Sequence, residues 1–354
     1  MKTALVILAL VLVFATALPL LRLDYWWIRV LDFPRAQITI AGILVLVLYL
    51  YFWDTKRVYE SVVLGLLVLA VGFQAVKMFP YTVLMPKQVL AAESPSDDAN
   101  LSLLVANVLI DNRESEAFLA IVREYDPDVI LTVETDDWWE EALRTLEVDY
   151  PHTLKNPLDN SYGMLVHSRL EMVDPEIRFI LKDSIPSMHT QVVLPSGDRV
   201  FMHFVHPDPP NPVYATATTA RDAELLIVGR ETEKRDRPTI IAGDFNDVAW
   251  SYTTSLFQKA SGLLDPRIGR GMYNTFNAKN WLLRWPLDHV FHSDHFKIVR
   301  IEKGPAWGSD HFPIFIELSL ESEAESEQEE PETNRGEEEQ VAENIEDGRQ
   351  ETEQ

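Results

Sequence analysis

The chain has 354 residues, with 55 acidic against 31 basic side chains, a net charge of −24 and no cysteine. Such an acidic chain excludes a nucleic-acid binder that works by bulk charge, because those proteins offer a basic surface to phosphates. The lack of cysteine excludes disulfides, thiolate zinc sites and a cysteine nucleophile. The length allows two or three domains, or one domain with appendages.

Three long apolar stretches occupy the first quarter of the chain. They are residues 3–21, 36–53 and 61–76, none of which contains a charged side chain. A membrane-spanning helix needs roughly 20 mostly apolar residues, so the first two stretches qualify, and the third does if Lys77 snorkels and the helix continues toward Leu84. A cleaved signal peptide is the alternative for the first stretch, but two further stretches follow closely. We therefore predict a membrane anchor of three transmembrane helices over residues 1–84.

The segment 22–35 between the first two stretches mixes aromatic side chains with arginine, which is typical of the membrane–water interface. An odd number of spans puts the two ends of the chain on opposite sides of the membrane. The basic residues of the connecting segments do not decide the orientation, but the short N-terminus before an apolar stretch favours an inside N-terminus. We expect a multi-pass protein of the cell membrane whose main domain is extracytoplasmic.

Composition also separates a linker and a tail from that main domain. Residues 85–100 are rich in Pro, Ser and Asp and have little to bury, so they are predicted to be a linker. Residues 321–354 carry a net charge of −13 and almost no apolar side chain, too little to offset the entropy of ordering the chain. We expect a disordered acidic tail there. Residues 101–320 are then one compact domain.

The main domain begins with a β-α-β-α pattern. Strands are expected over 101–108 and 129–133, and helices from Asn112 to Glu124 and over 138–146. Further strands are predicted over residues 164–167, 191–194, 200–205, 239–242, 290–292, 297–301 and 313–318. Strands outnumber helices, so the fold class is α/β, with sheets that stack and helices outside them.

Polar side chains interrupt or flank these strands. They are Asn107, Glu134, His206, Asp244, Asn246, Asp288 and the run Ser309-Asp310-His311. Carboxylates and amides cost several kcal/mol to bury without a partner, so several of them where strands converge predict a shared site that holds a cation.

Each of these residues also has an interpretation without chemistry. Asn107 alone could be a satisfied buried amide, Glu134 a helix cap and Asp288 a turn residue. His203, which alternates with phenylalanines along its strand, is interpreted as a core or supporting histidine. The run Gly243-Asp-Phe-Asn246 is harder to explain in this way, because it puts two oxygen-bearing side chains on one side of a turn. An acid next to a histidine, as at Asp310-His311, is an economical metal or acid/base unit.

Taken together, these motifs resemble the endonuclease/exonuclease/phosphatase superfamily, of DNase I-like fold. The residues that carry the resemblance are Asn107, Glu134, Gly243-Asp-Phe-Asn246, Leu287-Asp-His-Val-Phe291 and Ser309-Asp-His311, in the family's order over residues 101–319. The resemblance implies a four-layer α/β sandwich of two stacked β-sheets flanked by helices, with the site at the strand ends.

The resemblance also implies roles for single residues. Asn107 and Glu134 would hold a divalent cation, with Asp310 near it. Asp244 would orient or deprotonate the attacking water, and His206 and Asn246 would contact the scissile phosphate. His311, oriented by Asp288, would stabilise the charged transition state or transfer a proton. Ser161 and Tyr162 match a segment that often borders the phosphate pocket. Leu109 departs from the polar residue common in nucleases of the family, which weighs against DNA chemistry or against a second metal position.

An oxygen-rich ligand set without thiolates favours Mg²⁺ or Mn²⁺. Three functions compete: a membrane-anchored, metal-dependent phosphohydrolase, whose phosphorylated substrate could be lipid-linked; a nuclease on the same scaffold; and a non-catalytic binding module. The intact set of polar residues argues against the binding module. The acidic domain and the anchor favour the phosphohydrolase over the nuclease. A local basic patch could still grip a nucleic-acid backbone or lipid headgroups, and its expected members are Arg267, Arg270, Lys279 and Arg284.

Overall fold

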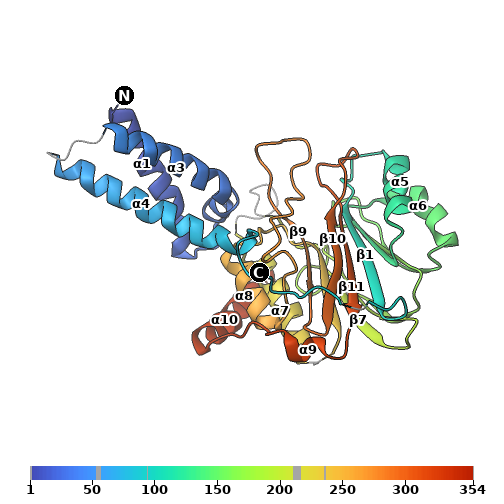
Figure 1. Ribbon diagram of the computed structural model, residues 1–354. Helices are drawn as coiled ribbons and strands as arrows, with labels where there is room; N and C mark the ends of the chain where they lie inside the picture. Colours follow the sequence, from blue (N-terminus) through green and yellow to red (C-terminus); the bar gives the residue numbers. More distant parts are fainter. Residues whose placement is uncertain (1, 53–56, 94, 210–216, 235–236, 354) are drawn as a thin grey trace.

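The computed structural model describes residues 2–52, 57–93, 95–209, 217–234 and 237–353. A bundle of three long helices projects from one side of a β-sandwich (Figure 1). The bundle consists of α1 (Lys2–Ala17), α3 (Arg35–Phe52) and α4 (Val58–Met78). With the short helices that extend them, residues 2–21, 35–52 and 58–81 are long and apolar enough to cross a membrane. Trp53, the expected end of the second stretch, lies outside the described residues.

The three long helices bury only a narrow seam between them. Ala9, Leu12 and Leu67 are among its buried members, whereas Ile40 and Leu69 on the outer faces are 61% and 71% exposed. At most 28% of any of the three apolar windows is buried inside the protein. Apolar surface of this extent would be costly in water, so the outer faces are suited to lipid.

The segment between α1 and α3 packs against the sandwich. It contains three short helices, η1 (Leu18–Leu21), α2 (Trp26–Arg29) and η2 (Val30–Asp32), and a further one, η3 (Phe79–Tyr81), follows α4. The Trp250 indole N–H donates a 2.8 Å hydrogen bond to the Asp32 carbonyl, and the Tyr81 hydroxyl donates one of 2.6 Å to the Ala249 carbonyl. Phe33 and Met78 pack with Trp250 in one apolar cluster. The anchor and the sandwich therefore share a buried interface.

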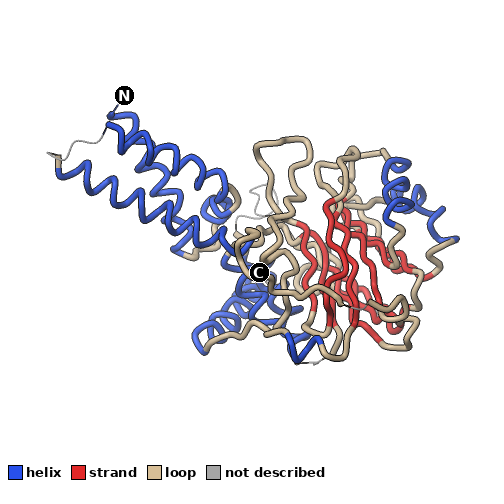
Figure 2. Tube along the Cα trace, in the orientation of Figure 1, coloured by secondary structure: helices blue, strands red, loops and turns tan. Residues whose placement is uncertain are grey.

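Two sheets stack face to face in the sandwich, where Figure 2 draws the strands in red. The six-stranded sheet has the order β10-β11-β1-β2-β4-β3, and the five-stranded sheet has the order β5-β6-β7-β8-β9. The strands of the first sheet are β1 (Asn100–Asn107), β2 (Val129–Val133), β3 (His152–Asn156), β4 (Met164–Ser168), β10 (Phe296–Lys303) and β11 (Ile314–Leu320). Those of the second are β5 (Met172–Arg178), β6 (Ser187–Val193), β7 (Arg199–Phe204), β8 (Thr239–Asp244) and β9 (Asp288–His292).

Helices cover the outer face of each sheet. On the first sheet they are α5 (Ser115–Tyr125) and α6 (Asp137–Leu143), followed by η4 (Arg144–Val148); on the second they are α7 (Thr219–Glu233) and α8 (Tyr252–Ser261). The main core lies between the sheets, where Val105 and Leu131 of one pack with Phe204 and Ile240 of the other. Every strand predicted from the sequence is present, and the four-layer α/β sandwich is confirmed.

The acidic tail is not disordered, contrary to our prediction. It forms α9 (Ala324–Glu327) and α10 (Arg335–Thr352), and α10 packs along α7 (Figure 1). A capping box of Asn334 and Glu337 begins α10. Val341 is fully buried, and Gly348 lies so close to α7 that a Cβ there would be 2.2 Å from the Ala223 Cβ. A single buried face with a complementary helix therefore suffices to order a tail of very low apolar content.

Charge complementarity adds to this packing. Lys259 on α8 pairs with Glu337 at 2.6 Å, and Arg230 on α7 pairs with Glu338. The predicted linker is also packed rather than free: Val89 is fully buried, and the Ala92 N–H donates a 2.9 Å hydrogen bond to the Ile298 carbonyl.

The docked tail leads to a stability prediction. Val341→Ala removes two buried carbons, so the free energy of unfolding of the full chain should fall by about 1–2 kcal/mol. Chemical denaturation in detergent micelles measures this change, with Asp347→Ala on the exposed side of α10 as the matched control. Equal stability of the two variants would show that α10 does not dock.

Candidate active site

The polar residues predicted from the sequence meet at one end of the sandwich, where strands of both sheets end. Parallel pairing aligns Asn107 with Val133, so Glu134 follows directly beside Asn107. In the other sheet, antiparallel pairing sets Asp244 at the end of β8 opposite Asp288 at the start of β9. The register of the two sheets thus gathers residues that lie far apart in the sequence.

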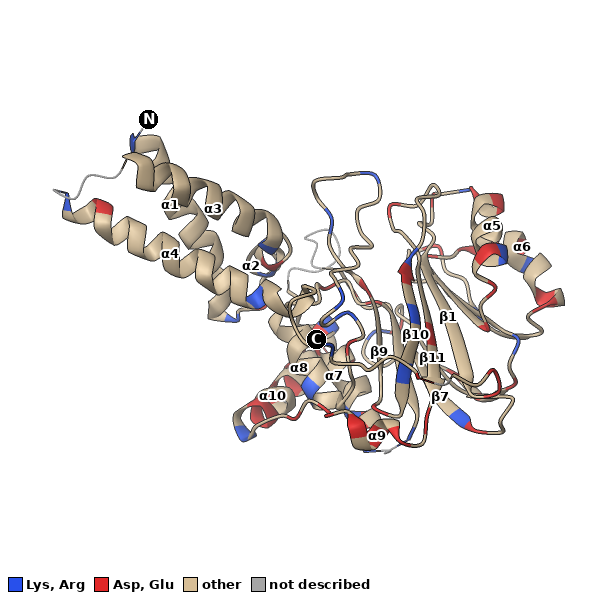
Figure 3. Ribbon diagram, viewed as in Figure 1, with Lys and Arg blue, Asp and Glu red and all other residues tan. Residues whose placement is uncertain are grey.

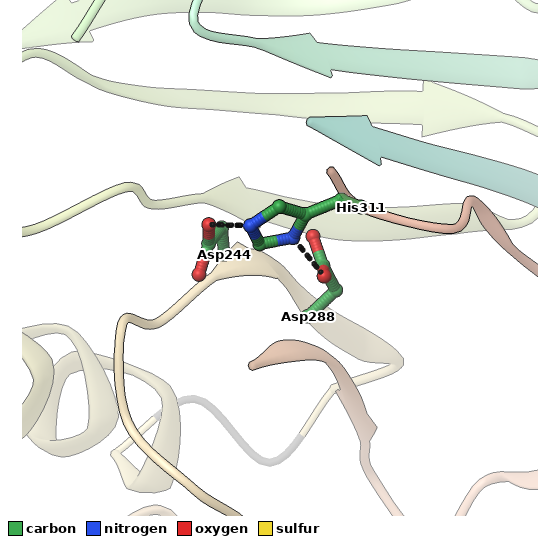
Figure 4. Close-up of side chains that lie close together, drawn as sticks. All are labelled: Asp244, Asp288 and His311. Carbon is green, nitrogen blue, oxygen red and sulfur yellow. Dashed lines mark hydrogen bonds and ion pairs between the residues drawn. The ribbon is translucent and has the colours of Figure 1, made fainter. Parts of the chain in front are cut away.

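Asp244, Asp288 and His311 form the centre of the site (Figure 4). The His311 Nδ1 lies 2.7 Å from Asp288 Oδ2, and its Nε2 lies 3.7 Å from Asp244 Oδ2. All three side chains are buried. The carboxylate of Asp288 fixes the orientation of the imidazole ring, so that the opposite nitrogen faces Asp244.

The charges of this trio are set by burial and by one another. Burial alone would lower the pKa of His311, but the carboxylates of Asp288 and Asp244 outweigh it and raise that pKa to about 10. Burial and repulsion from Asp288 raise the pKa of Asp244, and the nearby His311 partly offsets this rise. His311 is therefore a cation at neutral pH, held between two acidic side chains.

Asn107 and Glu134 lie beside this trio. The Asn107 amide donates hydrogen bonds to Glu134 Oε1 at 2.7 Å and to Asp244 Oδ2 at 3.1 Å. Burial raises the pKa of Glu134 to about 7, and the negative charges of Asp244 and Asp310 add to the rise. No lysine or arginine among the described residues forms an ion pair with Glu134, so its negative charge lacks a full counter-charge within the protein.

The arrangement fits a divalent cation. Among the described residues, Asp244, Asp288 and His311 bring atoms of ligand type within 4.8 Å of one another. Because His311 is cationic, the donors of this group are the carboxylate oxygens of Asp244 and Asp288. The Oδ1 atom of Asp288 is buried without a hydrogen-bond partner. The carboxylate of Glu134 supplies oxygen donors that a hard cation takes. The Asn107 side-chain oxygen accepts a hydrogen bond from the Leu109 N–H at 2.9 Å, so this amide would turn to offer its oxygen to the cation. The site is therefore rich in acidic oxygens that a cation would neutralise.

His206 and Asn246 occupy the side of the site that the second sheet forms. The His206 Nε2 lies 3.9 Å from Asp244 Oδ2, and its Nδ1 has no hydrogen-bond partner. Burial lowers the pKa of His206 despite the attraction of Asp244, so this ring is neutral at pH 7. The Asn246 amide donates to the Pro207 carbonyl at 2.9 Å, and its backbone N–H donates to Asp244 Oδ1 at 2.9 Å. Asn246 thus orients Asp244 as well as lining the cleft.

Ser161 and Tyr162 line the same cleft. The Tyr162 hydroxyl donates a 2.7 Å hydrogen bond to Asp208 Oδ1, and Asp208 also pairs with Lys182. Sequence reasoning missed Asp208, although it stands two residues after His206. Its only signal was the rigid Pro-Asp-Pro loop in which it lies.

The backbone of the site is unusual. Eight described residues other than glycine have a positive φ, and four of them line the cleft: Leu109, Glu134, Ser161 and Asn246. Such conformations are costly outside glycine and tend to collect at functional sites. Gly243 has φ 147°, and a Cβ there would be 1.9 Å from the Val205 carbonyl oxygen. Only glycine lets β8 approach the end of β7 closely enough to bring Asp244 near His206.

The cleft above these residues has a volume of about 480 Å³. Its floor is polar and includes Asp310, whereas its walls are apolar. The wall residues are Val30, Phe33, Leu109, Ile110, Phe276, Trp285 and Leu287. Val30 and Phe33 come from the segment between the long apolar helices α1 and α3, so the N-terminal helical region forms part of the site. No pattern in the sequence predicts this contact.

The predicted basic patch does not exist as we expected it. Arg267 is buried and bound to both carboxylate oxygens of Asp265 at 2.8 Å. Arg270 donates a 2.7 Å hydrogen bond to the Val89 carbonyl. Both side chains stabilise the fold, because a buried guanidinium must form its hydrogen bonds inside the protein. Lys279 and Arg284 remain, in a loop beside the cleft.

Solved structures with the same fold share little sequence with this chain. Humanised TDP2 from D. rerio matches with a TM-score of 0.51 and 16% identity, over 62% of this chain and 99% of that chain. The human Nocturnin catalytic domain with bound sulfate gives 0.51 and 15%, over 68% and 99%. An endonuclease/exonuclease/phosphatase protein from Beutenbergia cavernae gives 0.52 and 18%, over 63% and 72%.

Comparison with curated proteins gave no significant match. The sequence itself, however, matches a described family over residues 104–311, which is more than half of the chain and contains most of the gathered site residues. On this match, together with the shared fold, the chain belongs to the Endonuclease/Exonuclease/phosphatase family.

Proposed function

We propose that the protein is a membrane-anchored, divalent-metal-dependent phosphohydrolase that cleaves phosphoester bonds by attack of water. Members of its family are usually hydrolases of such bonds. The observation that carries the proposal is the trio Asp288–His311–Asp244, buried at the floor of a cleft beside Glu134 and Asn107. A binding module would have no need of so many buried acidic groups, which cost stability.

The trio supplies the proton chemistry of the proposed reaction. A phosphoester resists hydrolysis because its negative charge repels the nucleophile. The Asp244 carboxylate, 3.7–3.9 Å from the ring nitrogens of His311 and His206, is placed to orient a water molecule and accept its proton. The cationic His311, held by Asp288, stabilises negative charge that develops on the phosphate oxygens. A divalent cation at Glu134 and Asn107, with Asp310 near it, would neutralise further charge on the phosphate.

Two features of the cleft favour a phosphohydrolase over a nuclease. None of the described residues that line it is a lysine or an arginine. A groove that follows a nucleic-acid backbone is positively charged as a rule. Leu109 and Ile110 also give this side of the cleft an apolar surface. Turnover by the full chain of phosphomonoesters, diesters and plasmid DNA, compared at equal Mg²⁺, tests the choice; DNA as the preferred substrate would favour the nuclease.

Activity should require Mg²⁺ or Mn²⁺ and should disappear in EDTA. Glu134→Gln keeps the shape of the side chain but removes its charge, so half-maximal activity should need at least about tenfold more Mg²⁺. Glu140→Gln, on the outer helix α6, is the matched control and should leave the metal requirement unchanged. Metal titration of turnover and calorimetry of Mg²⁺ binding measure the effect. Full turnover in EDTA would exclude the metal.

His311 and Asp288 should act as one unit. His311→Ala and Asp288→Ala should each reduce kcat by about 10² or more, the scale of acid–base terms. The double variant should be little worse than the worse single variant, because members of a unit are not additive. His152→Ala, at the opposite end of the first sheet, serves as control. Near-normal turnover by a folded His311→Ala protein would remove this mechanism.

We further propose that the sandwich lies outside the cytoplasm. The N-terminus and the sandwich lie at opposite ends of the three-helix bundle (Figure 1). Since the chain has no cysteine, Val148→Cys, which is 85% exposed in the native protein, provides a single labelling site. A membrane-impermeant maleimide should label it in intact spheroplasts. Labelling that appears only after permeabilisation would place the sandwich in the cytoplasm.

A further inference from the structure

The loop Asn277–Arg284, here called the 277–284 loop, exposes three successive large apolar side chains at its apex. Trp281 is 82% exposed, Leu282 56% and Leu283 42%. A run of exposed apolar residues on a soluble surface is a liability, and its presence commonly marks a binding surface. These three residues belong to neither the catalytic trio nor the walls of the cleft.

The loop is built to hold these side chains outward. The Asn280 side-chain oxygen accepts hydrogen bonds from the N–H groups of Leu282 at 2.9 Å and Leu283 at 3.1 Å. Arg284 Nε donates to the Asn277 carbonyl at 3.2 Å and to the Asn280 carbonyl at 3.1 Å. The loop therefore satisfies several of its own backbone polar groups. Such internal satisfaction is what a segment needs when it leaves water for a less polar medium.

The apex of the loop lies beside the end of the helix bundle that is nearest the sandwich. The Gln37 side-chain amide, in the first turn of α3, donates a 2.8 Å hydrogen bond to the Leu282 carbonyl. In Figure 1 the loop, drawn in orange above β9, rises beside the end of the helix bundle nearest the sandwich. The apex is therefore level with the point where α3 would enter a bilayer. Trp27, in the segment between α1 and α3, is 48% exposed near the same boundary.

The charges around the apex fit the same surroundings. Lys279 and Arg284 flank the three apolar residues in the sequence, and Figure 3 colours basic positions on this loop blue. Trp and Leu flanked by basic residues are typical of segments that lie in the interface of a bilayer, where cations meet lipid phosphates.

A row of aromatic rings connects this loop with the catalytic trio. The Phe33 ring contacts Trp285 at 5.7 Å between centroids, Trp285 stacks on Phe276 at 5.9 Å, and Phe276 lies 5.0 Å from the His311 ring. The Ala278 N–H also donates a 2.6 Å hydrogen bond to the Asp310 carbonyl. The base of the loop thus forms one wall of the cleft, and its apex extends toward the membrane.

We propose that the 277–284 loop inserts Trp281, Leu282 and Leu283 into the interfacial layer of the bilayer, so that the cleft faces the membrane. The substrate is then an amphiphile of the membrane with a phosphate in its headgroup. Its phosphate reaches Asp244 and His311, while its apolar part lies along the aromatic walls. The identity of the substrate rests on the proposed phosphohydrolase function, whereas insertion of the loop does not.

A second copy of the chain could also cover the apex, but the surroundings favour lipid. The apex adjoins α3, whose outer face is itself suited to lipid, and basic residues flank it. A bilayer that surrounds the anchor must approach the loop, whereas a second copy would have to displace lipid there.

Fluorescence quenching tests the insertion. A single cysteine at position 281 (Trp281→Cys) in the full chain carries an environment-sensitive fluorophore, and Val148→Cys provides the exposed control. In vesicles of phosphatidylcholine and phosphatidylglycerol, doxyl-labelled lipids should quench the label at 281 but not the label at 148, and iodide should do the reverse. Quenching at 281 by iodide alone would overturn the insertion. Protection from both quenchers that grows with protein density would indicate a second copy and would also overturn it.

Turnover tests the substrate class. The variant Trp281→Ser/Leu282→Ser/Leu283→Ser should hydrolyse phosphatidate or phosphatidylglycerol in vesicles at least about tenfold more slowly, because interfacial binding scales with buried apolar area. Its turnover of soluble 4-nitrophenyl phosphate and bis(4-nitrophenyl) phosphate should be unchanged. Hydrolysis of the soluble esters without either lipid would overturn the lipid substrate alone. No hydrolysis of any ester would remove the proposed function, while the quenching result would still decide the insertion.

Discussion

The active site depends on the cost of keeping several carboxylates out of water in one place. Asp244 and Asp288 are almost completely buried next to each other, and Glu134 lies close by. Each buried charge costs several kcal/mol unless an opposite charge or hydrogen bonds compensate it. Within the protein the compensation comes from His311, whose ring touches Asp288 and faces Asp244. The same concentration of negative charge that makes His311 a cation also favours binding of a metal ion at the site.

A second buried charge network links this site to the anchor. Arg29, between the apolar helices α1 and α3, pairs with Asp24 at 2.6 Å and lies 3.7 Å from Asp222 on α7. Asp222 binds Arg221 at 2.6 Å, and Arg221 in turn donates a 2.9 Å hydrogen bond to the Asn246 carbonyl. Removing one charged member of such a network leaves the other charges unpaired in a medium of low dielectric constant. The anchor therefore contributes to the position of Asn246, as well as to the wall of the cleft.

The sequence predicted the elements whose structure depends on a local pattern of residues. It did not predict the elements whose structure depends on packing against a distant part of the chain. Strands with continuous apolar runs, such as 129–133, were predicted to the residue because burial on both faces leaves no alternation to misread. Helix α7 was missed because it buries Arg221 and Asp222 in the charge network and so lacks an amphipathic pattern. The order of α10 could not be read from its composition, because it depends on the surface of α7.

The candidate site shows the same division. Sequence motifs identified Asp244 and His311, because each lies next to a strand that the sequence predicts. The walls of the cleft were not foreseen, because Phe33 and Trp285 meet only through the packing of the anchor on the sandwich. The positive φ values of Glu134 and Asn246 likewise follow from the turns that end their strands. The residue types at these two positions do not predict such a conformation.

An acidic protein with the proposed function cannot rely on long-range attraction to collect its anionic substrate. Residues 90–320 carry a net charge of −15, and this field repels a phosphate once it comes within about a Debye length, roughly 8 Å in physiological salt. Attraction must then come from groups at contact distance, which under the proposed function are His311 and the divalent cation. Confinement of the substrate to a membrane would supply the high local concentration that electrostatic steering does not. A cleft with an acidic floor, apolar walls and an anchor in its rim is consistent with that means of delivery.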